Sequence, residues 1–95
     1  MQQKIGKQVE VAVTYKGTEI VPVKLRWDKK EYRLIKLGLV YPVREGITKH
    51  WFFSVSTDTL CFLLDHNTSD LSWTLVEVSD GLVDVLVHPH MALRS

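Results

Sequence analysis

Apolar and polar residues alternate along most of the chain, which is the period of a β-strand with one buried face. Between residues 9 and 16, apolar side chains hold the odd positions and mostly polar ones the even positions. In residues 23–28, Val23, Leu25 and Trp27 alternate with charged residues. Further runs are rich in β-branched and aromatic residues, which pack well on a pleated surface; they cover residues 32–41, 50–57, 60–65, 71–79 and 82–87.

Short polar segments separate these runs at the spacing of about 8–12 residues that is typical of an all-β sandwich or barrel. Asp80-Gly81 gives the clearest hairpin signal, because a type I′ turn needs a positive φ at both central positions. Pro22 stands just before a strand, where its missing N–H does little harm. Pro42 is expected to break the strand over residues 32–41 or to bend it out of the sheet. No segment has a helical period.

These features predict an all-β fold, a single small antiparallel barrel of six to seven short strands in a meander. Closure of the sheet into a barrel would remove its edges. An SH3-like barrel is the favoured match in size, and an OB-like barrel is the alternative. We expect an N-terminal tail over residues 1–8, a barrel domain over 9–80, and a C-terminal strand and tail over 81–95.

The bulk composition fits one globular domain. The chain has 95 residues, of which 45% are hydrophobic and 24% charged, as in soluble proteins. Its one cysteine excludes an internal disulfide. It has no N-terminal apolar stretch of the signal-peptide type and no run of the roughly 20 apolar residues that span a bilayer. These features predict a cytoplasmic protein without a membrane partner.

Charge divides unevenly along the chain and gives its main functional signal. Residues 1–50 contain eleven of the twelve Lys and Arg residues against five acids, and residues 51–95 contain one against six. The halves therefore carry +6 and −5, although the net charge is +1. Such asymmetry indicates a charged partner. Whether the two halves also separate in space stays open, because strands of both halves can interleave in a barrel.

The basic residues of the first half cluster around one predicted hairpin. Two of them share a strand face, two lie in the following turn and two return on the next strand. Such a cluster binds a polyanion by releasing its counterions, and an exposed aromatic side chain would stack on bases. The predicted nucleic-acid-binding residues are Lys24, Arg26, Lys29, Lys30, Arg33, Lys36, Tyr41 and Phe52. The alternative is a solvated outer face whose lysines protect an edge strand.

The sequence contains no complete metal site and no complete catalytic site. The pair in His88-Pro89-His90 falls short of the three or four convergent ligands that zinc needs, so we predict no metal and no cofactor. Residues 65–70 resemble the start of a calcium loop but lack its glycine, and a polar hairpin loop is the better interpretation. Glu77 would face Asp84 across the Asp80-Gly81 hairpin, but no nucleophile or oxyanion hole accompanies them. We predict no catalytic residues and no enzyme activity.

Three tryptophans fall on the apolar faces of three different predicted strands: Trp27, Trp51 and Trp73. Each is expected in the core, with its indole N–H directed at a hydrogen-bond partner. An aromatic cage that holds a ligand is the alternative, and it needs an opening.

The order of the strand sequences resembles a family of small bacterial domains of unknown function. The matching segments lie between residues 9 and 79, and the longest are Pro22-Val23-Lys24-Leu25-Arg26-Trp27, His50-Trp51-Phe52-Phe53-Ser54-Val55 and Trp73-Thr74-Leu75-Val76-Glu77-Val78. Members occur as short stand-alone proteins and attached to proteins similar to Y-family DNA polymerases. The family usually has an Arg-Gly or similar turn where this chain has Asp28-Lys29-Lys30-Glu31. The resemblance implies a bacterial origin and a link to DNA transactions, and it carries over no functional residues.

Together these observations predict a non-catalytic binding module, with a DNA or RNA backbone as the favoured ligand. The alternative is a protein–protein or self-association module. In that interpretation, complementary charged faces or the apolar run over residues 82–87 would join two copies into a homodimer.

Overall fold

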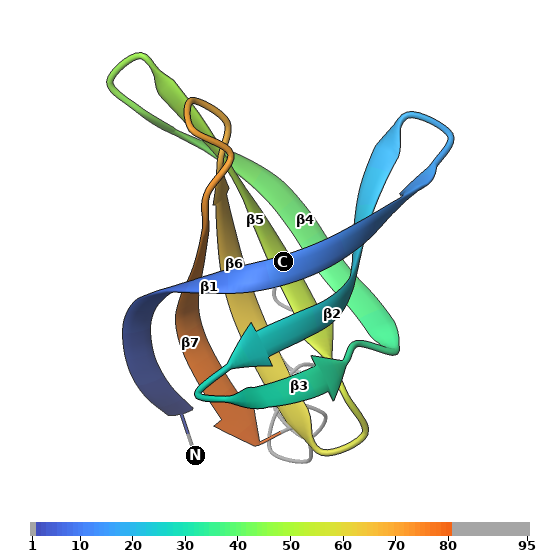
Figure 1. Cartoon of the computed structure of the whole chain (residues 1–95). Coiled ribbons are helices and arrows are strands. Elements are labelled where there is room, and N and C mark those ends of the chain that lie inside the picture. The colour runs from blue at the N-terminus through green and yellow to red at the C-terminus, as the bar shows by residue number, and fades with distance from the viewer. Residues whose placement is uncertain (1, 81–95) are drawn as a thin grey trace, which may run out of the picture.

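The computed structural model describes residues 2–80 and is built of strands alone within that range (Figure 1). One seven-stranded antiparallel sheet has the order β3-β2-β1-β7-β6-β5-β4. The all-β meander predicted from the sequence is thereby confirmed. The strands are β1 (Gln2–Lys16), β2 (Glu19–Trp27), β3 (Lys30–Arg33), β4 (Lys36–Glu45), β5 (Thr48–Ser56), β6 (Leu60–Asn67) and β7 (Trp73–Asp80).

The sheet curls into an open barrel, because its two edge strands, β3 and β4, follow each other in the chain. Two residues link these edge strands, and their backbone N–H groups form hydrogen bonds to β2 and to β5. Leu34 N–H donates to the carbonyl of Val23 at 3.0 Å, and Ile35 N–H donates to the carbonyl of Ser56 at 2.8 Å. In the described residues, no ladder joins β3 to β4 beyond this link. The barrel is therefore open, whereas the sequence suggested a closed one.

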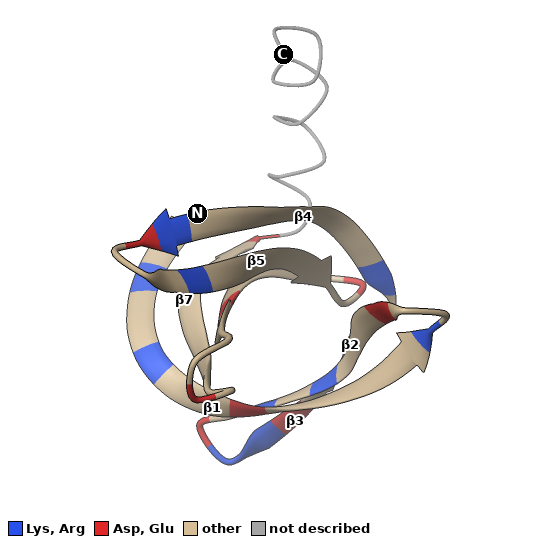
Figure 2. Cartoon of the chain, turned by 90° about the horizontal axis from the view of Figure 1, so that it is seen from above, with Lys and Arg blue, Asp and Glu red and all other residues tan. Residues whose placement is uncertain are grey.

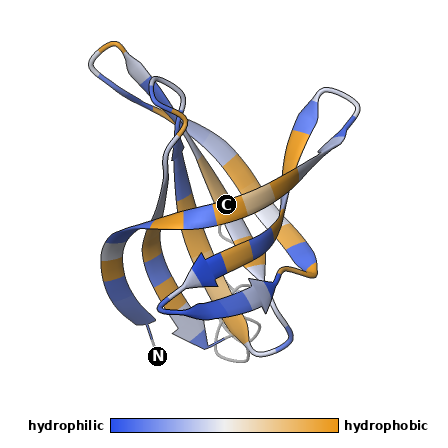
Figure 3. Cartoon of the chain, viewed as in Figure 1, coloured by the Kyte–Doolittle hydropathy of each residue, from blue (hydrophilic) through white to orange (hydrophobic). Residues whose placement is uncertain are grey.

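The curled sheet forms two layers whose inner faces share one core. Strands β1–β3 cross in front of β4–β7 in Figure 1. The largest fully buried side chains come from both layers, and alternating apolar bands mark the strands in Figure 3: Leu25, Val55, Phe62, Leu64 and Leu75. Burial of each such side chain contributes about 1.5–3 kcal/mol to folding.

Aromatic contacts tie the layers together. The rings of Trp27 and Tyr32, from β2 and β3, lie 6.4 and 5.2 Å from the ring of Phe62 on β6, both edge to face. This geometry is the favoured one for aromatic pairs. The inner faces therefore point at each other, and the outer faces of the two layers point in opposite directions.

The N-terminal residues differ from the expected tail. Residues 2–8 belong to β1 and pair with β7, where Gln2 lies opposite Ser79 and Lys4 opposite Glu77. The ladder shifts between Lys4 and Lys7, where Gly6 has a φ of 65° that a glycine adopts at little cost. This segment carries few apolar side chains, and so its sequence lacks the alternation of a half-buried strand.

The expected strand over residues 32–41 and the break at Pro42 are also corrected. Residues 34 and 35 divide the run into β3 and β4, and β4 continues through Pro42 to Glu45. Pro42 lies opposite Trp51 in the β4–β5 pair. Because β4 is a sheet edge, a residue without an N–H is tolerated there.

The predicted Asp80-Gly81 hairpin, its Glu77–Asp84 pair, the strand over residues 82–87 and the His88-Pro89-His90 sequence lie outside the described residues. Within them, Glu77 accepts a hydrogen bond at 2.9 Å from the side-chain amide of Gln2.

Candidate functional site

The uneven charge of the sequence is preserved in the folded layers. Strands β1–β3 and their turns contain eight Lys and Arg residues against four acids. Residues 36–80, which form β4–β7, contain three against six. Figure 2 shows the basic bands along β1 and around the β2–β3 hairpin. The β1–β3 layer therefore carries a net positive charge and the β4–β7 layer a net negative charge. We call the outer side of β1–β3 the basic face.

The β2–β3 hairpin carries the densest part of the basic face. Leu25 and Tyr32 lie opposite each other and point inward, so their neighbours Lys24 and Arg33 form an outward pair. Two residues, Asp28 and Lys29, make the turn with φ angles of 55° and 66°. A tight turn with two positive φ angles matches the twist of the strands, and it presents Lys29 at the tip.

Acidic residues lie opposite a cation at one cross-strand position of this hairpin but not at the next. Arg26 lies between Glu10 of β1 and Glu31 of β3, so charge alternates in sign across three strands. The next row is different, because Lys24 stands between Ala12 and Arg33 and thus directly faces another cation. Like charges opposite each other destabilise a ladder. Glu31 partly offsets this repulsion, because its Oε1 lies 3.8 Å from Lys24 Nζ. Both side chains are exposed, so this ion pair contributes about 0–1 kcal/mol to stability.

The structure does not bring all the predicted site residues together. Lys24, Arg26, Lys29, Lys30 and Arg33 share the β2–β3 hairpin. Lys36 begins β4 and thus belongs to the other layer.

The predicted aromatic residues lie on that other layer as well. Tyr41 and Phe52 stack on each other, with their ring centroids 5.4 Å apart and their planes at 10°. Phe52 points outward because its neighbours on β5, Trp51 and Phe53, face the interior. The phosphate-binding and base-stacking halves of the predicted site therefore lie on opposite faces.

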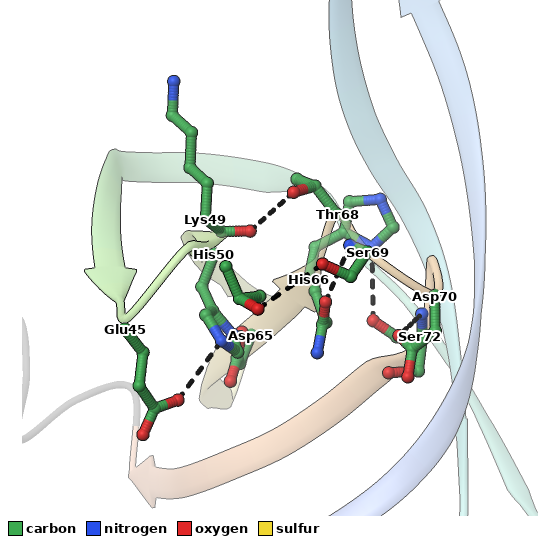
Figure 4. A network of polar contacts seen from close by, with 11 residues as sticks. Glu45, Lys49, His50, Asp65, His66, Thr68, Ser69, Asp70 and Ser72 are labelled. Atoms are coloured by element: carbon green, nitrogen blue, oxygen red, sulfur yellow. Dashed lines mark hydrogen bonds and ion pairs between the residues drawn. The ribbon is translucent and has the colours of Figure 1, made fainter.

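A polar network on the acidic layer was not anticipated from the sequence (Figure 4). His50 Nδ1 lies 2.7 Å from Oδ1 of Asp65, and its Nε2 lies 3.4 Å from Oε1 of Glu45. The His50 side chain is only 12% exposed, so the two carboxylates hold its ring in one orientation. These residues come from three strands, and the pairing of His50 with Asp65 depends on a register that the alternation alone does not give. In residues 2–80 no three potential ligands are placed to hold a metal ion.

The loop between β6 and β7 satisfies its own polar groups. The side chain of Asn67 accepts the N–H of Ser69 at 2.8 Å, and Asp70 accepts the N–H of Ser72 at 2.9 Å. The backbone N–H of Ser72 chiefly lowers the pKa of the Asp70 carboxyl, and the hydroxyl of Ser72 adds to the effect. These Asx-type bonds are typical of a polar loop, which agrees with the preferred sequence interpretation.

The tryptophans face inward as predicted, but one of them borders an opening. Trp73 is buried, and Trp27 packs against the core. Trp51 also packs there, and in addition it lines a cavity of about 300 Å³ on the open side of the barrel. Sequence reasoning could not find this cavity, because it forms between the β1–β2 turn and strands β4–β6, which are far apart in the sequence.

Comparisons with known proteins give no match for this chain among protein-family models, curated proteins or solved structures. Residues 2–80 contain no helix with the length and hydrophobicity to cross a membrane. The function is therefore argued from the charged faces and the cavity themselves.

Proposed function

We propose that this protein is a non-catalytic module that binds a nucleic-acid backbone on the outer face of β1–β3. The observation that carries the proposal is the separation of charge between the layers, which gives a small, nearly neutral protein one strongly basic face. Such a face attracts a polyanion over a distance and is strengthened by the release of its counterions.

The β2–β3 hairpin supplies the contacts. Lys24 and Arg33 repel each other in the free protein, so a phosphate between them stabilises both. Lys29 and Lys30 extend the surface beyond the end of the ladder, and Lys30 lies opposite Trp27 at the last pair. These residues give a minimal patch of four cations without an acid directly opposite.

The ligand is bound through its phosphates rather than its bases. Contacts to phosphates position a nucleic acid without reading its sequence. Tyr41 and Phe52, the predicted stacking residues, occupy the other layer and already stack on each other. We therefore expect single- and double-stranded DNA to bind with similar affinity and little sequence preference, which departs from the stacking role suggested by the sequence.

The test compares two triple variants that change the net charge equally. Lys24→Gln, Lys29→Gln and Lys30→Gln together neutralise the hairpin. Lys36→Gln, Arg44→Gln and Lys49→Gln together neutralise cations on β4 and β5. Fluorescence anisotropy of labelled DNA follows binding between about 50 and 200 mM salt.

The hairpin variant should lose most of its affinity, and the slope of log K against log salt should fall by about 2–3, since each lost phosphate contact reduces it by about 0.7–0.9. The matched control should keep nearly the wild-type slope. Equal losses in the two variants, or no binding of DNA by the wild type at low salt, would refute the proposal.

A second candidate function, self-association, is favoured by one observation on β4. This ten-residue strand is exposed along its whole length and forms the edge of the sheet. Leu37, Leu39, Val40, Tyr41 and Val43 stand among its exposed large apolar residues. Long, apolar edge strands tend to pair with another strand. The partner we propose is β4 of a second copy, rather than the strand over residues 82–87 that the sequence suggested.

Charge complementarity supports this pairing. An antiparallel β4–β4 pair with its two-fold axis between Val40 and Tyr41 places Lys36 of each copy opposite Glu45 of the other. Opposite charges facing each other across a ladder are stabilising. A two-fold arrangement makes both contacts at once.

A further inference from the structure

The cavity on the open side of the barrel has walls from both layers. Thr18, Glu19 and Ile20 at the β1–β2 turn form one wall. Strands β4, β5 and β6 form the other, with Leu37, Val40, Trp51, Phe53 and His66. Its volume of about 300 Å³ lies at the lower end of the range for small-molecule sites. Since a water molecule in the liquid takes roughly 30 Å³, the space suits a molecule of about ten non-hydrogen atoms.

His66 is the polar group that gives this cavity a chemical preference. It is 7% exposed and is the one buried polar side chain among the described residues. Its ring stacks on Trp73 with centroids 4.1 Å apart and planes at 18°, which fixes the ring plane. Nδ1 lies 3.3 Å from the carbonyl oxygen of Ser72 (Figure 4). A carbonyl only accepts, so Nδ1 carries the proton, and Nε2 of the neutral ring is an acceptor.

Nothing in residues 2–80 donates a hydrogen bond to Nε2 of His66. Yet no side-chain nitrogen or oxygen in that range is both fully occluded and unbonded, so Nε2 keeps access to space. His66 is one of the residues that line the cavity. An accessible acceptor in a mostly apolar wall offers a directional contact to a bound molecule that carries an N–H or O–H group.

We propose that the cavity binds a small, mostly apolar molecule through one N–H or O–H group that donates to Nε2 of His66. The apolar body of the ligand packs on Ile20, Leu37, Val40 and the aromatic rings of β5. Glu19 is exposed at the rim, and Lys49 Nζ lies 4.9 Å from the ring centroid of Trp51, so charges of both signs border the cavity. The cavity is separate from the surface proposed for nucleic acid.

The binding test uses two probes of the same shape. Indole has an N–H donor, and benzofuran has an acceptor oxygen in its place. Each is titrated into the full chain and followed by NMR of the backbone amides and of the His66 ring nitrogens. Indole should cause saturable shifts around Val40, Trp51 and His66 and should move the Nε2 resonance. Benzofuran should bind about tenfold more weakly, because it leaves Nε2 without a donor.

Variants on the exposed edge strand β4 distinguish binding in the cavity from non-specific binding to the protein surface. Val40→Trp fills the cavity from β4 and should abolish the indole shifts. Val43→Trp is the matched control, because Val43 is as exposed on the same strand (40% against 41% for Val40) but does not line the cavity. His66→Phe keeps an aromatic ring beside Trp73 and removes the acceptor, so the two probes should bind equally.

Three outcomes would overturn the inference. They are the absence of saturable shifts with indole, equal affinity of the wild type for both probes, and unchanged indole binding in Val40→Trp. None of these outcomes bears on DNA binding by the hairpin, so the two proposals stand or fall separately.

Discussion

At the scale of single residues, Asp70 gives the structure a defined response to acid. Its pKa is lowered because the ionised carboxylate accepts the N–H of Ser72 in the β6–β7 loop. A lowered pKa in the folded state means that the ionised form stabilises the loop. This contribution is complete above the unfolded value of 3.8 and is lost as the pH falls through the lower folded value.

We predict that the amide resonance of Ser72 titrates with a midpoint below 3.8. The change should stay within the loop, because Asp70 is exposed and takes no part in the core. NMR of the chain between neutral pH and about pH 2 measures it, and Asp70→Ala should remove the response. A midpoint at or above the ordinary carboxyl value would contradict the assignment.

Phe62 tests how much one buried ring contributes to stability. It is fully buried and contacts Trp27 and Tyr32 of the opposite layer. Phe62→Ala should lower the free energy of unfolding by about 3–5 kcal/mol, from lost burial and the cavity left behind. Phe52→Ala is the control, because Phe52 stacks on the outer face with Tyr41 alone, and it should cost about 1–2 kcal/mol. Urea denaturation measures both, and equal losses would show that the core assignment is wrong.

At the scale of elements, the sequence predicts best the strands that have one face in the core. Strand β2 alternates visibly in sequence, because Leu25 is buried while its charged neighbours meet solvent. Strands β5, β6 and β7 are recognised instead as runs of residues that favour strands, and only their burial alternates. The start of β1 and the end of β4 were missed for a common reason. Both are exposed on their two faces, so their pairing with β7 and β5 leaves no periodic signal.

Prediction of the candidate site from the sequence is limited in the same way, because its local features are predictable and those that depend on the whole fold are not. The basic hairpin follows from a period of two and a short turn, which are local properties of residues 24–33. The distance of Tyr41 and Phe52 from it depends on how the whole sheet curls, and the contact of His50 with Asp65 depends on strand register. The cavity beside His66 depends on how the β1–β2 turn lies against β4–β6. None of these features is encoded in a short stretch of sequence.

The edge strand β4 gives a prediction about association. In an antiparallel β4–β4 pair centred between Val40 and Tyr41, Leu39 of each copy lies opposite Pro42 of the other. A charge introduced at Leu39 would therefore be placed against an apolar residue twice, near the centre of the interface. Leu39→Lys should therefore weaken self-association at least tenfold, since Leu39 is 66% exposed in the centre of the strand. Ile47→Lys is the control, because Ile47 is 97% exposed beyond the strand end. Sedimentation equilibrium gives the monomer–dimer constants. A wild type that stays monomeric at high concentration would exclude the pairing.

At the scale of the whole molecule, the two proposed binding functions use different parts of one open barrel. The basic face needs only the outer side chains of β2 and β3, while the cavity needs the gap between the layers. A ligand in the cavity would contact residues of β4, β5 and β6 and those of the β1–β2 turn, so it would bridge the two layers. Binding there should raise the stability of the whole fold through mass action, because an unfolded chain has no cavity.

The open barrel also raises the question of whether its layers unfold together. Within residues 2–80, the β1–β7 ladder joins them on one side and only the link through Leu34 and Ile35 does so on the other. The core indicates that the two layers unfold together, because Leu25 of β2 and Leu64 and Leu75 of the other layer are completely buried in a single cluster. Neither layer keeps its apolar face covered without the other, since a sheet with one bare face is not stable in water.

We therefore predict one cooperative transition in urea. Trp27 reports on one layer and Trp73 on the other, so tryptophan fluorescence and far-ultraviolet circular dichroism should give coincident curves. Leu25→Ala should shift both curves together, with a loss of about 2–5 kcal/mol. If the β1–β3 layer were independently labile, Leu25→Ala would instead separate the curves, with part of the fluorescence change preceding the loss of strand signal. The basic face would then belong to a layer that can detach, and binding of DNA would stabilise that layer alone.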